Sequence, residues 1–254
     1  MFSNDGSSAP THLSVRAISL AGAALVGAAW KLDALRRDRR AARMHRVAIE
    51  LLLNALQADD AVTGRHSRRV ADLADALADQ LRMNRRERAT LRVAALLHDM
   101  GKVDDRFFHI IHSRDPLTPE QRVEIEGHPG HGADILEPLE AIHPGIREIV
   151  SSHHECWDGS GYPQGRAASE IPLGARIIAL ADVFDAITQP RAYRDPVEIP
   201  VALDHLRQGA HSKFDPQLVE LIATPRVWTR WARIARRGLR DERSQEDEPA
   251  PASG

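Results

Sequence analysis

The stretch that decides the fold is HSRRVADLADALADQL, residues His66–Leu81. Its apolar residues recur at intervals of three and four, with arginine and aspartate between them: Val70, Leu73, Leu77 and Leu81. This is the period of an amphipathic α-helix that buries one face and leaves the other in water. The stretch therefore predicts a long helix packed on a core.

The same helical spacing returns further along the chain, in Leu91–His98, Ile146–His153 and Ile177–Phe184. Thr118–Gln121 predicts a helix start, with threonine as the cap, proline in the first turn and glutamine three residues after the cap. No segment alternates apolar and polar residues persuasively with period two. The predicted fold class is therefore all-α.

Composition narrows the function classes. The formal net charge is -2 and neither sign dominates, so no nucleic-acid partner is predicted. The single cysteine, Cys156, excludes a disulfide framework and indicates a reducing compartment. The chain holds 13 histidines, and histidine is the commonest metal-binding side chain, so their clustering matters most.

Shifts in composition divide the chain into predicted segments. Residues 1–12 are rich in Ser, Gly, Pro and Asn and predict a disordered N-terminus. Residues 13–45 hold a hydrophobic helix and a basic linker. Residues 46–223 form the main helical domain, and residues 224–254 form a basic amphipathic helix and a disordered acidic tail.

The hydrophobic helix at residues 13–30 is open to more than one interpretation. Its uninterrupted part, Ala17–Trp30, is too short for a hydrocarbon core of about 30 Å, and extending it back to Leu13 takes in Arg16. As an anchor, it would tether a cytoplasmic domain to the inner membrane, because an arginine cluster follows it. The alternatives are an Ala-rich soluble helix and an uncleaved signal-like segment.

The C-terminal helix is also open to two interpretations. After Pro225, a stripe of Trp228, Trp231 and Ile234 lies among arginines. Such a helix can lie on an anionic membrane surface. Alternatively, it docks its tryptophans on the main domain and leaves the arginines in water.

Side chains suited to metal binding gather in the main domain: His66, His98, Asp99, His128, His153, His154 and Asp182. Taken singly, each histidine is more often structural than a ligand. The adjacent pairs His98-Asp99 and His153-His154 can each direct two donor groups into one pocket. Asp182 lies in a strongly apolar helix, where an unpaired charge would be costly.

All of these donors are nitrogen or oxygen atoms, which suits iron, manganese or zinc. Two such metals about 3.5–4 Å apart can acidify a shared water and clamp the attacking and leaving oxygens of a phosphoryl displacement. Lys102, one helical turn beyond His98, could stabilise the negative charge that grows on the phosphate. Alternatively, Lys102 is a surface lysine near a helix end. The residues by themselves predict a two-metal phosphoester hydrolase.

Longer motifs resemble a known family. His98-Asp99 resembles the doublet of the HD phosphohydrolase superfamily, and HHECWDGSGYPQG (His153–Gly165) closely resembles the signature of the HD-GYP family. Other matching blocks occur in the family's order: AVTGRHSRRV (Ala61–Val70), LLHDMGK (Leu96–Lys102), GHPGHGADIL (Gly127–Leu136), IPLGARIIALADVFDAIT (Ile171–Thr188), RAYR (Arg191–Arg194) and FDPQLVELI (Phe214–Ile222). Ordered blocks are far more specific than one doublet. The resemblance implies an HD-type helical bundle with HD-GYP extension helices over residues 46–223.

The resemblance also implies an activity. Members of the family hydrolyse cyclic di-GMP to linear pGpG, and some continue to GMP, with a hydroxide that bridges two divalent metals, iron or manganese. One metal would be held by His66, His98, Asp99 and Asp182. The other would be held by Asp99, His128, His153 and His154. Catalytic roles fall to Asp99 and Lys102, and contacts with substrate phosphates fall to Lys102, Arg191 and Arg194.

This sequence departs from the family pattern near the site. Some members bind a third metal through a glutamate four residues before the first histidine, but here that position is Val62, so two metals are predicted. The family's apolar Gly-Ile-Pro loop is replaced by Asp104-Asp105-Arg106, which leaves the substrate contacts at the entrance open. The alternatives are an HD-type hydrolase for another cyclic dinucleotide or a nucleotide, and a cyclic di-GMP-binding module without catalysis.

The loop Trp157–Pro163 turns sharply because of its glycines and proline. It is interpreted as a structural turn beside the metal ligands. The resemblance to the family also implies that this loop is an interaction surface for diguanylate cyclase domains of the GGDEF type. The sequence predicts no oligomeric state.

Overall fold

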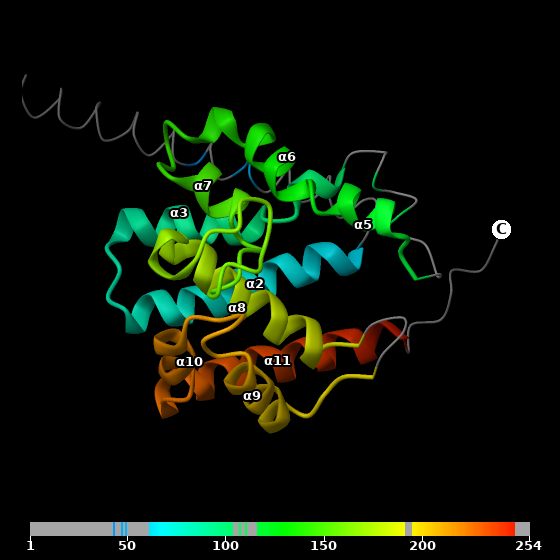
Figure 1. Ribbon diagram of the computed structural model, residues 1–254. Coiled ribbons are helices and arrows are strands. Elements are labelled where there is room, and N and C mark those ends of the chain that lie inside the picture. The colour runs from blue at the N-terminus through cyan, green and yellow to red at the C-terminus, as the bar shows by residue number, and fades with distance from the viewer. Residues whose placement is uncertain are drawn as a thin grey trace, which may run out of the picture. The chain divides into compact units, whose positions relative to one another are not determined.

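Figure 1 shows the computed structural model of the chain. It describes residues 61–103, 107, 110, 116–190 and 195–246, with isolated positions 43, 47 and 49. The chain divides into two units, residues 1–52 and 53–254, and the helices below belong to the second unit. The hydrophobic helix predicted at residues 13–30 lies outside the described residues. Among the helices that are described, none is long and apolar enough to cross a membrane.

The second unit is built from helices joined by turns. They are α2 (Ala61–Gln80), α3 (Arg85–Leu96), η1 (Met100–Val103), α5 (Pro119–Ile125), α6 (His128–Ile135), η2 (Glu137–Leu139), α7 (Ile146–Ser151), η3 (Ala168–Glu170), α8 (Leu173–Thr188), α9 (Ile199–Gln208), α10 (Pro216–Ile222) and α11 (Pro225–Glu246). In the described part of the chain, the β-structure amounts to one isolated bridge between Ala210 and Phe214. The prediction of an all-α fold is confirmed.

Helix starts follow the capping chemistry of the sequence. The Thr118 hydroxyl accepts the Gln121 backbone N–H, and the Gln121 side chain accepts the Thr118 N–H, as predicted. Asn84 caps α3 in the same reciprocal way with Glu87. These bonds satisfy backbone donors that have no partner in the first turn of a helix.

Helix α2 is the centre of the packing. It contacts α3, α8 and α11, and in Figure 1 it runs between α3 and α11. Val70, Leu73 and Leu77 of its apolar stripe are fully buried, and Leu81, beyond the helix end, is half-buried. The face that the sequence predicted to be buried is therefore the face on which the neighbouring helices pack.

Helix α11 docks on α2 through its tryptophan stripe. Trp231 is fully buried, its ring lies 4.8 Å from that of Phe184 in α8, and its indole N–H donates to the Leu73 carbonyl at 3.0 Å. Trp228 is half-buried and its ring lies 6.1 Å from that of Phe184. These contacts support the interpretation in which α11 docks its tryptophans on the main domain.

Several arginines around that stripe are solvent-exposed, as the docking interpretation predicts, and also form ion pairs that it did not predict: the Arg226 side chain is 69% exposed and that of Arg237 57%. Three aspartates of α2 each pair with one arginine of α3 and with at least one arginine of α11. The pairs are Asp72 with Arg92 and Arg237, Asp75 with Arg88 and Arg230, and Asp79 with Arg88, Arg226 and Arg230. Solvent-exposed pairs of this kind contribute about 0.2–1 kcal/mol each, so the buried indole is the stronger anchor.

Replacing Trp231 by alanine should lower the free energy of unfolding by about 3–5 kcal/mol, because a large buried ring is lost and a cavity remains. Chemical denaturation followed by circular dichroism measures the loss. Val123→Ala is the control, because this side chain is 72% exposed, and it should change stability by less than about 0.5 kcal/mol. A loss for Trp231→Ala as small as that of the control would contradict this anchoring role.

Candidate metal centre

The structure brings the predicted metal ligands together in two groups of side chains. The first group is His66, His98 and Asp182, and the second group is Asp99, His128, His153 and His154. Within each group, the donor atoms lie within 4.8 Å of one another. The groups adjoin, because His98 and Asp99 are consecutive and the His98 ring lies 5.2 Å from that of His153.

Helix ends aim three of the imidazoles. In each case the ring Nδ1 lies within hydrogen-bond distance of a carbonyl oxygen three residues earlier, in the last turn of α3, α5 or α7. The pairs are His98 with Ala95 (2.9 Å), His128 with Ile125 (2.6 Å) and His153 with Val150 (2.6 Å). A carbonyl only accepts, so Nδ1 carries the proton and Nε2 of a neutral ring keeps a free lone pair.

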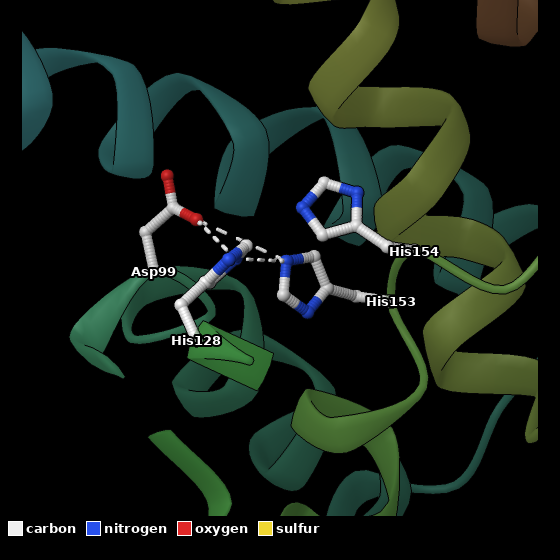
Figure 2. Close-up of side chains that lie close together, drawn as sticks. All are labelled: Asp99, His128, His153 and His154. Atoms are coloured by element: carbon white, nitrogen blue, oxygen red, sulfur yellow. Dashed lines mark hydrogen bonds and ion pairs between the residues drawn. The ribbon is translucent and has the colours of Figure 1, made fainter. Parts of the chain in front are cut away.

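These free lone pairs face one another. His128 Nε2 lies 3.4 Å from His153 Nε2, and Asp99 Oδ1 lies 3.3 Å from the first and 3.8 Å from the second, as Figure 2 shows. His98 Nε2 is buried without a hydrogen-bond partner among the described residues. Neither nitrogen of the His128–His153 pair has a proton to share, and buried lone pairs without partners are costly. Divalent cations, one in each group, would satisfy these lone pairs, so the residues fit metals.

Burial keeps most of the imidazoles neutral. Burial lowers the pKa of His98 and holds the pKa of His153 well below its usual value. It lowers the pKa of His154 to about 3. Burial also opposes the charged form of His66, but hydrogen bonds to Asp182 and Asp185 outweigh it and raise the pKa of His66 to about 9. A divalent metal would have to displace that proton from His66.

The carboxylates are ionised. Burial alone would raise the pKa of Asp99, but the Lys102 ammonium beside it outweighs burial and holds the pKa well below its usual value. The pKa of Asp182 is also lowered, because its hydrogen bond and charge interaction with His66 outweigh burial. The site therefore offers anionic oxygen donors beside neutral nitrogen donors, the combination that divalent transition metals bind.

Lys102 lies at the edge of this centre. Its Nζ is 2.7 Å from Asp99 Oδ1, and its side chain is 30% exposed. The preceding Gly101 lets η1 approach α6 closely, because a Cβ there would meet the His128 carbonyl oxygen and the Gly132 nitrogen. Lys102 is thus a cation held beside the metal ligands, with part of its side chain open to solvent.

The sequence reasoning missed a layer of charged residues behind His66. Asp185 Oδ2 lies 2.8 Å from His66 Nδ1, and Arg69 holds Asp185 with two bonds of 2.7 and 3.0 Å. A signal was present, because Asp185 follows Asp182 by three residues and Arg69 follows His66 by three. In a helix such pairs share a face.

The loop Trp157–Pro163 packs against the metal ligands. The Tyr162 ring stacks on that of His154, with centroids 4.9 Å apart. Gly161 admits no side chain, because a Cβ would meet the Cys156 nitrogen and the Glu155 backbone. These contacts support the structural interpretation of the loop, and its contact with diguanylate cyclase domains stays a prediction.

A cavity opens beside the metal ligands. It is lined by His153, His154, Glu155, Cys156, Ala179, Asp182, Val183 and Lys213. Lys213 was not predicted, and it reaches this cavity because the Trp157 N–H donates to the Lys213 carbonyl at 3.2 Å. The Lys213 Nζ lies 5.7 Å from the centre of the Phe214 ring.

Some predicted residues lie outside the described part of the chain. These are Arg191, Arg194 and the segment Asp104–Arg106. Val62 lies in α2 one turn before His66, but its side chain is not described. The two-metal count and the role of both arginines stay predictions.

Comparison with known proteins gives a family match. The family described as "HD domain" matches residues 50–218. The chain is 36% identical over 174 residues to 3'3'-cGAMP-specific phosphodiesterase 2 of Vibrio cholerae, an alignment that covers 67% of this chain and 33% of that protein. It is 34% identical over 176 residues to the cyclic di-GMP phosphodiesterase of Thermotoga maritima, covering 68% of this chain and 47% of that protein. This chain thus spans a third to a half of the length of these curated relatives.

Solved structures share the fold. An HDG"Y"P protein from Bdellovibrio bacteriovorus aligns with a TM-score of 0.50 at 21% identity, covering 67% of this chain and 51% of that one. A cyclic GMP-AMP phosphodiesterase of V. cholerae aligns with a TM-score of 0.51 at 23% identity, covering 68% and 47%. At these identities the likeness concerns the helical arrangement alone.

Removing one ligand from each group should remove one metal at a time. We expect His66→Ala to lose the metal of the first group and His128→Ala that of the second, because each group would keep too few donors for tight binding. Elemental analysis of anaerobically purified protein measures the stoichiometry. His205→Ala, which removes an exposed histidine of α9, is the control and should match the unmodified protein. Retention of both metals by His66→Ala would contradict the assignment.

Gly101→Ala should weaken metal binding at the second group and lower the free energy of unfolding by roughly 1–3 kcal/mol, because η1 and α6 must move apart. Titration with Mn²⁺ and denaturant unfolding measure the two effects. Gly130→Ala in α6 is the matched control, because a Cβ there meets nothing within 4 Å. The control should leave stability unchanged or raise it. Equal behaviour of the two variants would contradict the close approach.

Proposed function

Because this chain belongs to the HD domain family, and within it to the HD-GYP type, we propose that it is a metal-dependent phosphodiesterase that hydrolyses cyclic di-GMP to linear pGpG. The observation that carries the proposal is the set of unprotonated nitrogens around Asp99, with Lys102 beside them. A nitrogen and carboxylate cage next to a cation suits the hydrolysis of an anionic phosphodiester.

The two groups of side chains would hold two divalent ions, for which iron or manganese fits the donors. The Asp99 carboxylate lies between the groups, with Oδ2 3.6 Å from His98 Nε2 and Oδ1 3.3 Å from His128 Nε2. This supports a bridging role for Asp99. When bound, the ions would lower the pKa of a water nucleophile and neutralise charge on the phosphate oxygens.

The chain's own residues orient the substrate and stabilise charge. Lys102 Nζ would stabilise the negative charge that develops on the phosphoryl oxygens as the ester bond breaks. By resemblance to the family, Arg191 and Arg194 would contact the phosphates and hold the diester in line. The Tyr162 ring fixes the plane of the His154 imidazole, because the two stack.

The second candidate substrate is 3'3'-cGAMP. It is favoured by the 36% identity to a V. cholerae protein named as specific for that dinucleotide. The two substrates have the same phosphodiester ring and differ in one base, so the metal centre and Lys102 serve both equally. Discrimination would fall to residues that contact the bases, near the departure at Asp104–Arg106.

Metal-loaded protein should convert cyclic di-GMP to pGpG and lose the activity when a chelator removes the metal. Chromatography of the products, run in parallel with 3'3'-cGAMP and cyclic di-AMP, gives kcat/KM for each substrate. A higher value for 3'3'-cGAMP would favour the second candidate. Binding of cyclic di-GMP without turnover at full metal occupancy would contradict the proposed activity and indicate a binding module.

Lys102→Ala should lower kcat about 10²–10³-fold while both metals stay bound, because one charge that stabilises the transition state is removed. Turnover and metal content are measured on the same preparation. Arg207→Ala removes an exposed cation on α9 and serves as the control. If Lys102→Ala lost metal instead, Lys102 would act by holding Asp99 in place.

A further inference from the structure

We propose that the C-terminal helix α11 acts as a positioning element for the first metal group, through Glu242, the α2 arginines Arg65 and Arg69, and Asp185. The proposal rests on the proposed function only in that the first group binds a metal. It assigns a role to residues that touch neither substrate nor metal.

A series of contacts connects His66 to α11, and the first is the contact between His66 and Asp185. His66 Nδ1 lies 2.8 Å from Asp185 Oδ2, and the two side chains are 10% and 2% exposed. This contact places the Nδ1 proton on the carboxylate side and turns Nε2 towards Asp182 Oδ1, 3.2 Å away. A carboxylate behind a metal-binding histidine fixes the ring and raises its basicity.

The second step is the contact between Asp185 and Arg69. Arg69 Nε lies 2.7 Å from Asp185 Oδ1, and Arg69 Nη2 lies 3.0 Å from Oδ2. This two-bond geometry leaves the carboxylate little freedom to rotate. Asp185 is only 2% exposed, so the Arg69 guanidinium is a close polar partner for a carboxylate that water scarcely reaches.

The third step reaches α11. Glu242 receives two bonds from Arg65, of 3.0 and 2.9 Å, and lies 3.5 Å from Arg69 Nη1. Arg65 and Arg69 are four residues apart on α2, one on each side of His66 in the sequence. A single carboxylate of α11 therefore holds the turn of α2 that carries His66, mainly through Arg65 and in part through Arg69.

The backbone of α11 also packs closely against the Arg69 side chain. A Cβ on Gly238 would meet Gln189 Oε1, and it would lie 2.8 Å from Arg69 Cδ. Gln189 in turn donates to the Ala235 carbonyl at 3.2 Å, which joins the end of α8 to α11. These contacts are independent of Glu242, and they show that α11 is fitted closely against Arg69.

Helix α11 (Pro225–Glu246) also lies beyond residues 50–218, which match the HD domain family. His66, by contrast, lies well inside the matched residues. A segment outside the matched domain thus orders a ligand of the metal centre. Loosening the C-terminal half of α11 would free the arginines and leave His66 less well oriented.

The test uses the full chain freed of metal and titrated with Mn²⁺ by calorimetry. Glu242→Gln keeps the shape of the side chain and removes its charge, so we expect binding at the first group to weaken severalfold, which is less than the roughly 10–100-fold typical of residues bonded directly to a metal ligand. Asp241→Asn is the matched control, because it makes the same charge change at the neighbouring exposed position of α11. This control should titrate like the unmodified chain.

Repeating the titration in a second variant distinguishes metal binding at the first group from metal binding at the second. In His66→Ala, which lacks a ligand of the first group, adding Glu242→Gln should leave the remaining binding event unchanged. Glu242→Asp keeps the charge and should lose less affinity than Glu242→Gln. Circular dichroism of each metal-free variant confirms that the helices are present.

The proposal is overturned if Glu242→Gln binds Mn²⁺ with unchanged affinity. It is also overturned if Asp241→Asn weakens binding as much, or if Glu242→Gln weakens the remaining event in His66→Ala. Because no substrate enters the titration, a failure to hydrolyse cyclic dinucleotides would defeat the proposed function without affecting this result.

Discussion

Unprotonated imidazole nitrogens that face one another in a buried space are the constraint on which the rest of this structure depends. His128 Nε2 and His153 Nε2 lie 3.4 Å apart, which is unfavourable for two lone pairs unless a cation lies between them. The arrangement persists because helix ends impose it. A carbonyl in the last turn of a helix has no partner within that helix, and here the Nδ1–H of the following histidine supplies one. The bond that completes the helix end thus also aims the ligand.

Much of the fold follows from the sequence for simple physical reasons. The stripe from Val70 to Leu77 predicts a buried helix face because apolar spacing is a local property, and Thr118 predicts its helix start because capping is local too. The convergence of His98-Asp99 with the other ligands was predicted from the cost of leaving Asp182 unpaired and from the ordered family motifs. The chemistry of the donors thus suggested a shared metal site, and the resemblance to the family implied which ligands share each metal.

What the sequence did not reveal depends on contacts between helices. Asp185 acts behind His66 only because α8 lies against α2 in one register. Glu242 is one charge among many in α11, and nothing local distinguishes it from Asp241. The arginines of α11 were expected in water, and Arg226 and Arg237 are mostly exposed, but their ion pairs with the aspartates of α2 were not predicted. Each of these roles is set by tertiary packing, which the spacing of residues along one helix does not encode.

The bonds between helix ends and histidines also couple metal supply to the folding equilibrium. Backbone carbonyls at helix ends aim three of the ligands, and the facing lone pairs of those ligands favour a bound cation. A cation that binds this folded arrangement, and not the unfolded chain, shifts the equilibrium by mass action. At a free metal concentration 100 times the Kd, one such site adds about 2.7 kcal/mol to the stability of the folded state. The abundance of the folded protein would then follow the availability of its metal.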